Sequence, residues 1–144
     1  MEVNVSKLSI LFTGGGSGGS TTPLLAVAYL LKDRRPDVSL SFIGTSYGPE
    51  GDLVRAAGIP FQTLPTAKYR RYVSWKNATN VVRLIAACLQ AWRLLRKNRP
   101  SVIVSAGSYV SVPVVWMGWL LGIPALIHQQ DIELARFELG QNLL

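Results

Sequence analysis

Acidic residues are scarce and unevenly placed in this 144-residue sequence, which has 8 Asp and Glu against 15 Lys and Arg. None of the acids lies between residues 53 and 130, an interval that holds ten Lys or Arg. A long interval without acids predicts an electropositive surface, which favours polyanions or an anionic membrane surface as partners.

Cysteine is also nearly absent, because Cys88 is the only one and no internal disulfide can form. This usage is typical of a reducing compartment. Cys88 falls in an apolar helical pattern, which predicts a buried, unreactive thiol rather than a nucleophile. No cationic segment followed by an apolar run opens the sequence, so we expect no signal peptide.

Charge of either sign is missing from residues 100–127. This interval exceeds the ~20 residues that span a bilayer, so a transmembrane helix is one interpretation. Glycines and prolines interrupt it, however, and VIVS and ALIH at its two ends have the composition of strands. Two buried strands that flank a helix explain the pattern better.

Strand-like and helix-like patterns alternate along the whole chain. We expect strands at residues 8–12, 39–43, 59–64, 102–105 and 125–128, and helices at 23–33, 51–57, 78–98 and 113–121. This alternation predicts a single α/β domain over residues 1–144, a Rossmann-like open parallel sheet with helices on both faces. Ligands bind such sheets outside the carboxyl ends of the strands. The loops at 14–22, 44–50, 66–77, 106–111 and 128–131 should meet there.

Glycine is concentrated in one of these loops, at positions 14, 15, 16, 18 and 19. The glycines follow an apolar strand pattern, and Thr22 and Pro23 then resemble the cap and first residue of a helix. A strand, a glycine loop and a helix start present backbone N–H groups to an anion. The segment therefore indicates recognition of a phosphate or diphosphate.

Three other interpretations of the glycines fit less well. Gly14-x-Gly16-x-x-Gly19 matches a dinucleotide-binding fingerprint, but no acid follows the second strand before Glu50. The segment is one residue short of a P-loop and has Ser20 where that motif has lysine. A plain turn needs only one or two glycines, because each one adds chain entropy that folding must overcome.

Four segments resemble, in order, the MurG family of bacterial peptidoglycan N-acetylglucosaminyltransferases. They are GGGSGGSTTPLLAVAYLL, FIGTSYGPEGDLVRAAGIPF, RPSVIVSAGSYVSVPV and LGIPALIHQQD, and together they extend over residues 9–131. The resemblance implies one half of a two-domain GT-B glycosyltransferase, the N-terminal, acceptor-binding half. The C-terminal domain, which binds the donor UDP-N-acetylglucosamine, is not expected within residues 1–144.

The resemblance also implies a site for the acceptor's diphosphate between two loops. The residues expected to bind it are Gly15, Gly16, Ser17, Gly18 and Gly19 of the first loop, and Gly107, Ser108, Tyr109 and Ser111 of the second. Other acceptor-side candidates are Arg70, Arg71, His128, Gln129 and Gln130. Arginine grips phosphate through two N–H groups, although a solvated loop and a structural histidine are the alternatives at 70–71 and 128. No cofactor or metal is implied.

The sequence departs from the family at two catalytic positions. Ser20 stands where the family's GGTGGH motif ends in a histidine that is thought to act in catalysis, and serine is no general base near neutral pH. The family's HEQN reads HQQD at residues 128–131. Asp131 is therefore either a replacement base or a cap for the segment that follows.

A lipid-linked acceptor implies a peripheral protein on the cytoplasmic face of the cell membrane. Residues 68–99 hold nine of the basic residues, and Tyr72, Trp75 and Trp92 lie among them, which suits the headgroup region. Trp116, Trp119 and Leu120 either add an exposed apolar patch or, as we prefer, pack in the core or against a partner domain. Nucleic acid would suit the same composition, but no motif for it is present.

Two functional hypotheses follow. In the first, the chain is the acceptor half of an inverting enzyme of peptidoglycan synthesis, and converts lipid I to lipid II once a donor domain is supplied. In the second, it is a non-catalytic membrane-anchoring and acceptor-binding subunit that needs a separate donor-binding chain. A nucleotide-dependent oxidoreductase is poorly supported, because the fingerprint lacks its acid.

Overall fold

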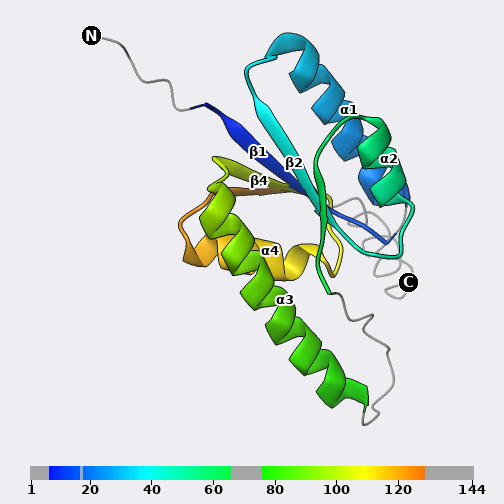
Figure 1. Cartoon of the computed structure of the whole chain (residues 1–144), viewed down its shortest axis with the longest axis vertical. Helices are drawn as coiled ribbons and strands as arrows, with labels where there is room; N and C mark the ends of the chain where they lie inside the picture. Colours follow the sequence, from blue (N-terminus) through cyan, green and yellow to red (C-terminus); the bar gives the residue numbers. More distant parts are fainter. Residues whose placement is uncertain (1–6, 17, 66–75, 129–144) are drawn as a thin grey trace, which may run out of the picture.

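The computed structural model describes residues 7–16, 18–65 and 76–128. Within these ranges strands and helices alternate strictly (Figure 1). The strands are β1 (Ser9–Thr13), β2 (Ser39–Gly44), β3 (Phe61–Thr63), β4 (Val102–Ser105) and β5 (Ala125–Ile127). The helices are α1 (Gly18–Arg34), α2 (Glu50–Ala56), α3 (Lys76–Asn98) and α4 (Ser111–Leu120).

The strands form one parallel sheet in the order β3-β2-β1-β4-β5. Leu11 at the middle of β1 pairs with Ser41 on one side and Ile103 on the other. The chain therefore builds outward from β1 in one direction and then returns to build outward in the other. That reversal places a topological switch point between β1 and β4, where ligands of open α/β sheets bind.

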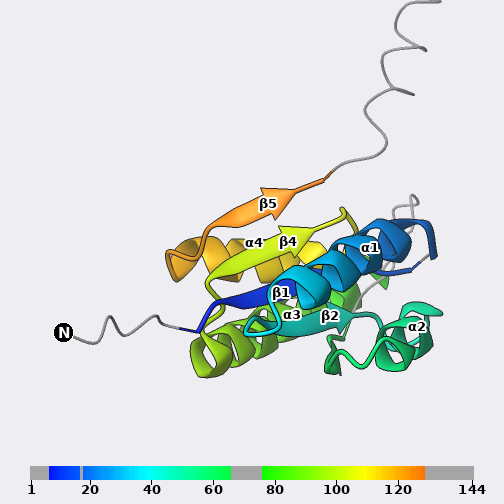
Figure 2. The same cartoon turned by 90° about the horizontal axis from the view of Figure 1, so that it is seen from above.

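Helices cover both faces of the sheet, so the expected Rossmann-like α/β fold is confirmed (Figure 2). Alternation along β1 turns Phe12 toward α1 and α2, where it packs with Phe42 and Leu24. The same alternation turns Leu11 toward α3 and α4, where it packs in a second cluster with Leu95 and Val114. The two clusters form the core and hold the strand ends in place.

The uncharged interval divides into β4, α4 and β5, as expected. The expected burial of both strands is wrong for β5, because all three of its residues are exposed at the edge of the sheet. Within the described ranges, no helix combines the length and hydropathy that crossing a membrane requires. The transmembrane interpretation of residues 100–127 is therefore wrong.

All four helices begin earlier than expected, and the starts of α1 and α4 matter for the site. α1 begins at Gly18 rather than at Pro23, which lies inside the helix. The Thr22 hydroxyl donates to the Gly18 carbonyl oxygen at 2.8 Å, so Thr22 is a residue of the first turns and not the N-cap. α4 likewise begins at Ser111 instead of Pro113. The N-termini of α1 and α4 therefore lie close to the carboxyl ends of β1 and β4.

Candidate functional site

Two loops meet at the switch point. The first, called the glycine loop, is residues 14–19 and joins β1 to the start of α1; the second, called the Tyr109 loop, is residues 106–110 and joins β4 to α4. The Ala106 N–H donates to the carbonyl oxygen of Thr13 at 3.1 Å, which ties the two loops together where they leave the sheet. The predicted diphosphate-binding residues therefore lie together.

The backbone N–H groups of the glycine loop differ in whether the protein itself supplies their acceptor. Gly14 donates to the Ile43 carbonyl oxygen at 3.4 Å, and Gly16 donates to Oε1 of Glu50 at 3.2 Å. Gly18 and Gly19 are the first residues of α1, where N–H groups have no acceptor inside the helix. The helix dipole adds partial positive charge at the same point. The start of α1 can therefore receive an anion, whereas the Gly16 N–H is already used.

The Tyr109 loop is closed by its own serine. The Ser108 carbonyl oxygen accepts from the Ser111 N–H at 2.9 Å, and the Ser108 hydroxyl accepts from the Val110 N–H at 3.4 Å. Ser111 is buried, and the Thr13 hydroxyl donates to its hydroxyl at 3.4 Å. Ser111 thus holds α4 against β1, and its side chain faces protein.

Tyr109 lies over the glycine loop. Its hydroxyl oxygen is 2.9 Å from the place where a Cβ at Gly16 would lie, and Gly16 has a positive φ of 86°, so glycine is required there on both grounds. The Tyr47 and Tyr109 hydroxyls form a hydrogen bond with an oxygen–oxygen distance of 3.1 Å. That bond, together with partial burial, raises the pKa of Tyr109 to about 12. Tyr109 is therefore a neutral phenol at the mouth of the site.

Glu50 is a site residue that sequence reasoning missed. Its side chain is fully buried at the start of α2, and Oε1 accepts hydrogen bonds from the N–H groups of Gly16 and Thr45 and from the Thr45 hydroxyl. No donor among the described residues reaches Oε2. Burial alone would raise the pKa of Glu50, but the hydrogen bonds from Thr45 and Gly16 outweigh it and hold the pKa below its ordinary 4.5. Glu50 is therefore a buried carboxylate.

The space around Glu50 explains several glycines of the sequence. A Cβ at Gly15 or at Gly48 would overlap the Glu50 carboxylate, and one at Gly44 would lie 3.1 Å from Glu50 Cγ. An acid surrounded by glycines at 44, 48 and 51 was the sequence signal for this residue. The burial of Glu50 also argues against the dinucleotide interpretation. Glu50 is the first acid after β2, and its carboxylate points into the protein, where it could not bind a ribose.

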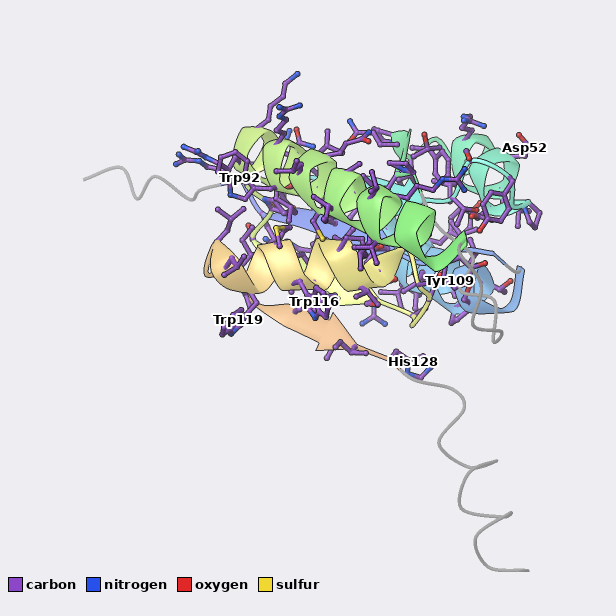
Figure 3. All side chains as sticks on the ribbon, turned by 90° about the horizontal axis from the view of Figure 1, so that it is seen from below. Asp52, Trp92, Tyr109, Trp116, Trp119 and His128 are labelled. Atoms are coloured by element: carbon purple, nitrogen blue, oxygen red, sulfur yellow. The ribbon has the colours of Figure 1, made fainter. Side chains whose placement is uncertain are left out.

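The remaining predicted residues are dispersed. Ser20 lies half-buried in the first turn of α1. His128 is exposed just beyond β5, and its backbone N–H donates to the Ser105 carbonyl oxygen at 2.7 Å. Figure 3 shows His128 and Tyr109 toward the same end of the molecule, opposite Trp92 and Trp119. Six candidates lie outside the described residues: Ser17, Arg70, Arg71, Gln129, Gln130 and Asp131.

A second feature, called the apolar groove, lies between α3 and α4, the two helices that cover one face of the sheet. It has a volume of about 470 Å³ and is lined by Leu84, Ile85, Cys88, Leu89, Trp92, Trp116, Met117 and Leu120. Trp119, beside it on α4, is 77% exposed, and Trp116 is 55% exposed. Core packing of Trp116, Trp119 and Leu120 is therefore wrong, and packing of these residues against a partner domain stays a prediction. Cys88 is only half-buried, and burial raises the pKa of its thiol.

Cations flank the apolar groove on α3. Arg83, Arg93 and Arg96 are all exposed, and the Arg96 guanidinium lies 4.6 Å from the centre of the Trp92 ring. Acidic groups that could neutralise them are absent from α3 and α4. Within the described residues, no cluster of His, Cys, Asp or Glu could hold a metal ion.

Known proteins similar to this chain agree on its family. The model of the glycosyltransferase family 28 N-terminal domain matches residues 10–135. The UDP-N-acetylglucosamine--N-acetylmuramyl-(pentapeptide) pyrophosphoryl-undecaprenol N-acetylglucosamine transferase of Shouchella clausii is 42% identical over 123 residues, which are 85% of this chain and 34% of that protein. The protein of the same name from Moorella thermoacetica is 40% identical over 124 residues, 86% of this chain and 33% of that one.

A solved structure gives the same answer. The crystal structure of Acinetobacter baumannii MurG superposes with a TM-score of 0.69 at 27% identity, and the match covers 85% of this chain and 34% of that one. The chain thus spans about a third of the length of the relatives it matches. With a family match over most of its length and the sheet of a GT-B N-terminal domain, the chain belongs to the glycosyltransferase family 28 N-terminal domain family.

Proposed function

We propose that this chain is the acceptor-binding half of an N-acetylglucosaminyltransferase. The full activity would move N-acetylglucosamine from UDP-N-acetylglucosamine to N-acetylmuramyl-pentapeptide carried on undecaprenyl diphosphate. The observation that carries this proposal is the meeting of the glycine loop and the Tyr109 loop at the switch point, in a chain 42% identical to a transferase of that name.

The acceptor's diphosphate would lie between the two loops. The N–H groups of Gly18 and Gly19 and the dipole of α1 would receive its negative charge. The Tyr109 hydroxyl, which is hydrogen-bonded to Tyr47, would face the diphosphate from the opposite side. Gly16 and Ser111 would shape the site rather than bind, because their N–H groups have partners in the protein.

Transfer of the sugar requires a general base, which the two loops do not supply. The acceptor 4-hydroxyl would displace UDP with inversion, and a general base must remove its proton. Ser20 cannot be that base near neutral pH. We therefore propose that the base comes either from Asp131 or from a donor-binding domain, supplied in cis or in trans, and that residues 1–144 alone do not turn over.

The apolar groove and its cations would hold the chain on the membrane that carries the acceptor. Exposed Trp116 and Trp119 would enter the headgroup region, where aromatic side chains are favoured. Arg83, Arg93 and Arg96 would face anionic lipids, and each such cation adds roughly 1 kcal/mol. The membrane would be the cell membrane, approached from the cytoplasm.

A non-catalytic subunit is the second candidate. The half-buried Ser20 at the start of α1 favours it, since the resembling family has a histidine at this position. Such a subunit would bind acceptor and membrane and would leave the chemistry to a separate donor-binding chain.

One experiment separates the candidates. Transfer of labelled N-acetylglucosamine to a lipid-diphosphate acceptor is measured with residues 1–144 alone and with an added donor domain of a relative. Turnover with the added domain that disappears on Asp131→Asn supports the acceptor half with its own base. Turnover that survives Asp131→Asn means that the donor domain supplies the base, and acceptor binding without turnover in any combination supports the non-catalytic subunit. Absence of both turnover and acceptor binding would refute both candidates.

A further inference from the structure

Three loops, not two, make contact at the switch point. The loop between β2 and α2, residues 45–49, reaches the glycine loop through Glu50 and the Tyr109 loop through Tyr47. Tyr109 in turn lies against Gly16 of the glycine loop. Each loop therefore contacts both of the others, and the contacts form a closed ring.

Glu50 is the centre of this ring. One oxygen of its carboxylate joins Gly16, which lies 34 positions earlier in the chain, to both donors of Thr45. The Thr45 hydroxyl also accepts from the Gly48 N–H at 3.2 Å, which closes the residue 45–49 loop on itself. Neither of the ion pairs in the described part of the chain includes Glu50. Among the described residues its charge is stabilised by these hydrogen bonds and by its own backbone N–H, so a shorter side chain would lose the bond to Gly16 or move the glycine loop.

Tyr47 supplies the other contact. It is exposed, and its hydroxyl forms a hydrogen bond with the Tyr109 hydroxyl at 3.1 Å. This bond fixes the position of the Tyr109 side chain over the glycine loop. The two tyrosines come from loops on opposite sides of β1 in the sheet order, and their bond sets the spacing between those loops.

We propose that the loop between β2 and α2 positions the diphosphate site. Glu50 and Tyr47 are its positioning residues, and they set the gap between the glycine loop and the Tyr109 loop without contacting the ligand. This inference rests on the proposed function, since the ligand is the acceptor's diphosphate. It adds a role for two residues that motif comparison alone did not single out.

The test uses the full 144-residue chain, labelled with ¹⁵N, with farnesyl diphosphate and inorganic pyrophosphate as probes. Their affinities are measured from the amide shifts of Gly18 and Gly19. Glu50→Asp keeps the charge but shortens the side chain, and we expect it to weaken probe binding by about tenfold, as the loss of a well-made hydrogen bond to a charged group does. Glu50→Gln keeps an oxygen at the Oε1 position and should retain the affinity to within about threefold.

Two further measurements separate positioning from a general effect on stability. The exchange rate of the Gly16 N–H should rise in Glu50→Asp and much less in Glu50→Gln, at a temperature where both variants are folded. Tyr47→Phe removes one surface hydroxyl and should weaken probe binding by about threefold through Tyr109. The matched controls are Asp52→Asn, an exposed acid on the same helix, and Tyr29→Phe, an exposed tyrosine on α1; neither should change affinity.

The outcomes are distinct. Failure of the unchanged chain to bind either probe would overturn the proposed function. Binding by the unchanged chain with equal affinity in Glu50→Asp would overturn the inference and leave the function standing. If Glu50→Asp does not fold, Tyr47→Phe decides, and unaltered binding by that variant overturns the inference.

Discussion

The carboxyl edge of the sheet and the α3–α4 surface break the usual pattern of burial in opposite ways. At the edge, polar groups are buried: Glu50, Thr45, Thr13 and Ser111 are all at most 3% exposed. On the α3–α4 surface, large apolar side chains are exposed, with Trp119 at 77% and Leu120 at 63%. Buried polar groups and exposed apolar patches are the departures that carry information about function.

The two departures have different physical costs and suit different ligands. A buried polar group must be hydrogen-bonded, so the edge is rigid and its geometry is specific. An exposed apolar surface is stabilised by contact with any apolar phase, so it needs area and not geometry. The first region suits a small anion of defined shape, and the second suits a lipid surface. Four predictions test this contrast.

The largest effect is expected at Glu50. Glu50→Ala leaves the N–H groups of Gly16 and Thr45 without an acceptor inside the protein, and should lower the free energy of unfolding by about 3 kcal/mol. Urea denaturation followed by circular dichroism measures it. Asp52→Ala, exposed on the same helix, should change little, and an equally large loss there would show that the edge is not special.

The next effect is expected at the apolar groove. Replacing Trp116 and Trp119 together by alanine should weaken binding to lipid vesicles by about 2 kcal/mol, roughly 30-fold, with unfolding nearly unchanged. Sedimentation with vesicles gives the affinity. The exposed Tyr29→Ala on the opposite face of the sheet serves as control. A large loss of stability would mean that the tryptophans serve the fold.

A smaller effect is expected from single cations of α3. Arg93→Gln should weaken binding to anionic vesicles by about 1 kcal/mol, roughly fivefold, and added salt should reduce the difference. Binding to neutral vesicles should not respond. Equal binding of the unchanged chain to neutral and anionic vesicles would contradict the electrostatic part of the proposal.

The smallest effect on stability is expected at the tyrosine pair. Tyr47→Phe should change the free energy of unfolding by less than about 0.5 kcal/mol. It should nevertheless lower the pKa of Tyr109 from about 12 toward the ordinary 10.0, because the hydrogen bond with Tyr47 is the main cause of the shift. Absorbance at alkaline pH, compared with Tyr109→Phe, follows this titration. An unchanged titration curve would show that the pair is not formed in solution.

Acid provides a further check on Glu50. Because its pKa is lowered in the folded protein, the unfolded chain takes up the proton first as the pH falls. The stabilisation is complete above the ordinary value of 4.5 and is lost as the pH falls through the lower pKa of the folded state. The melting temperature of Glu50→Gln should therefore approach that of the unchanged chain below pH 4.5.

Local patterns were sufficient for the fold class. Val102–Ser105 was expected from its apolar run, and the strand has those bounds. The start of α1 was misplaced because Pro23 is typical of a first helical position, whereas the helix begins five residues earlier at Gly18. The family resemblance is confirmed. The diphosphate site that it implies between the two loops stays a prediction.

The alternation of apolar segments by itself determined a parallel α/β sheet, and the glycine cluster predicted an anion site at its carboxyl edge, because both depend on neighbours in the chain. The burial of Glu50 and the exposure of Trp116 and Trp119 depend on which surfaces the other elements cover. Gly16 meets Glu50 across 34 positions, and Tyr47 meets Tyr109 across 62. Contacts at such separations have no local signature, so only the tertiary structure decided them.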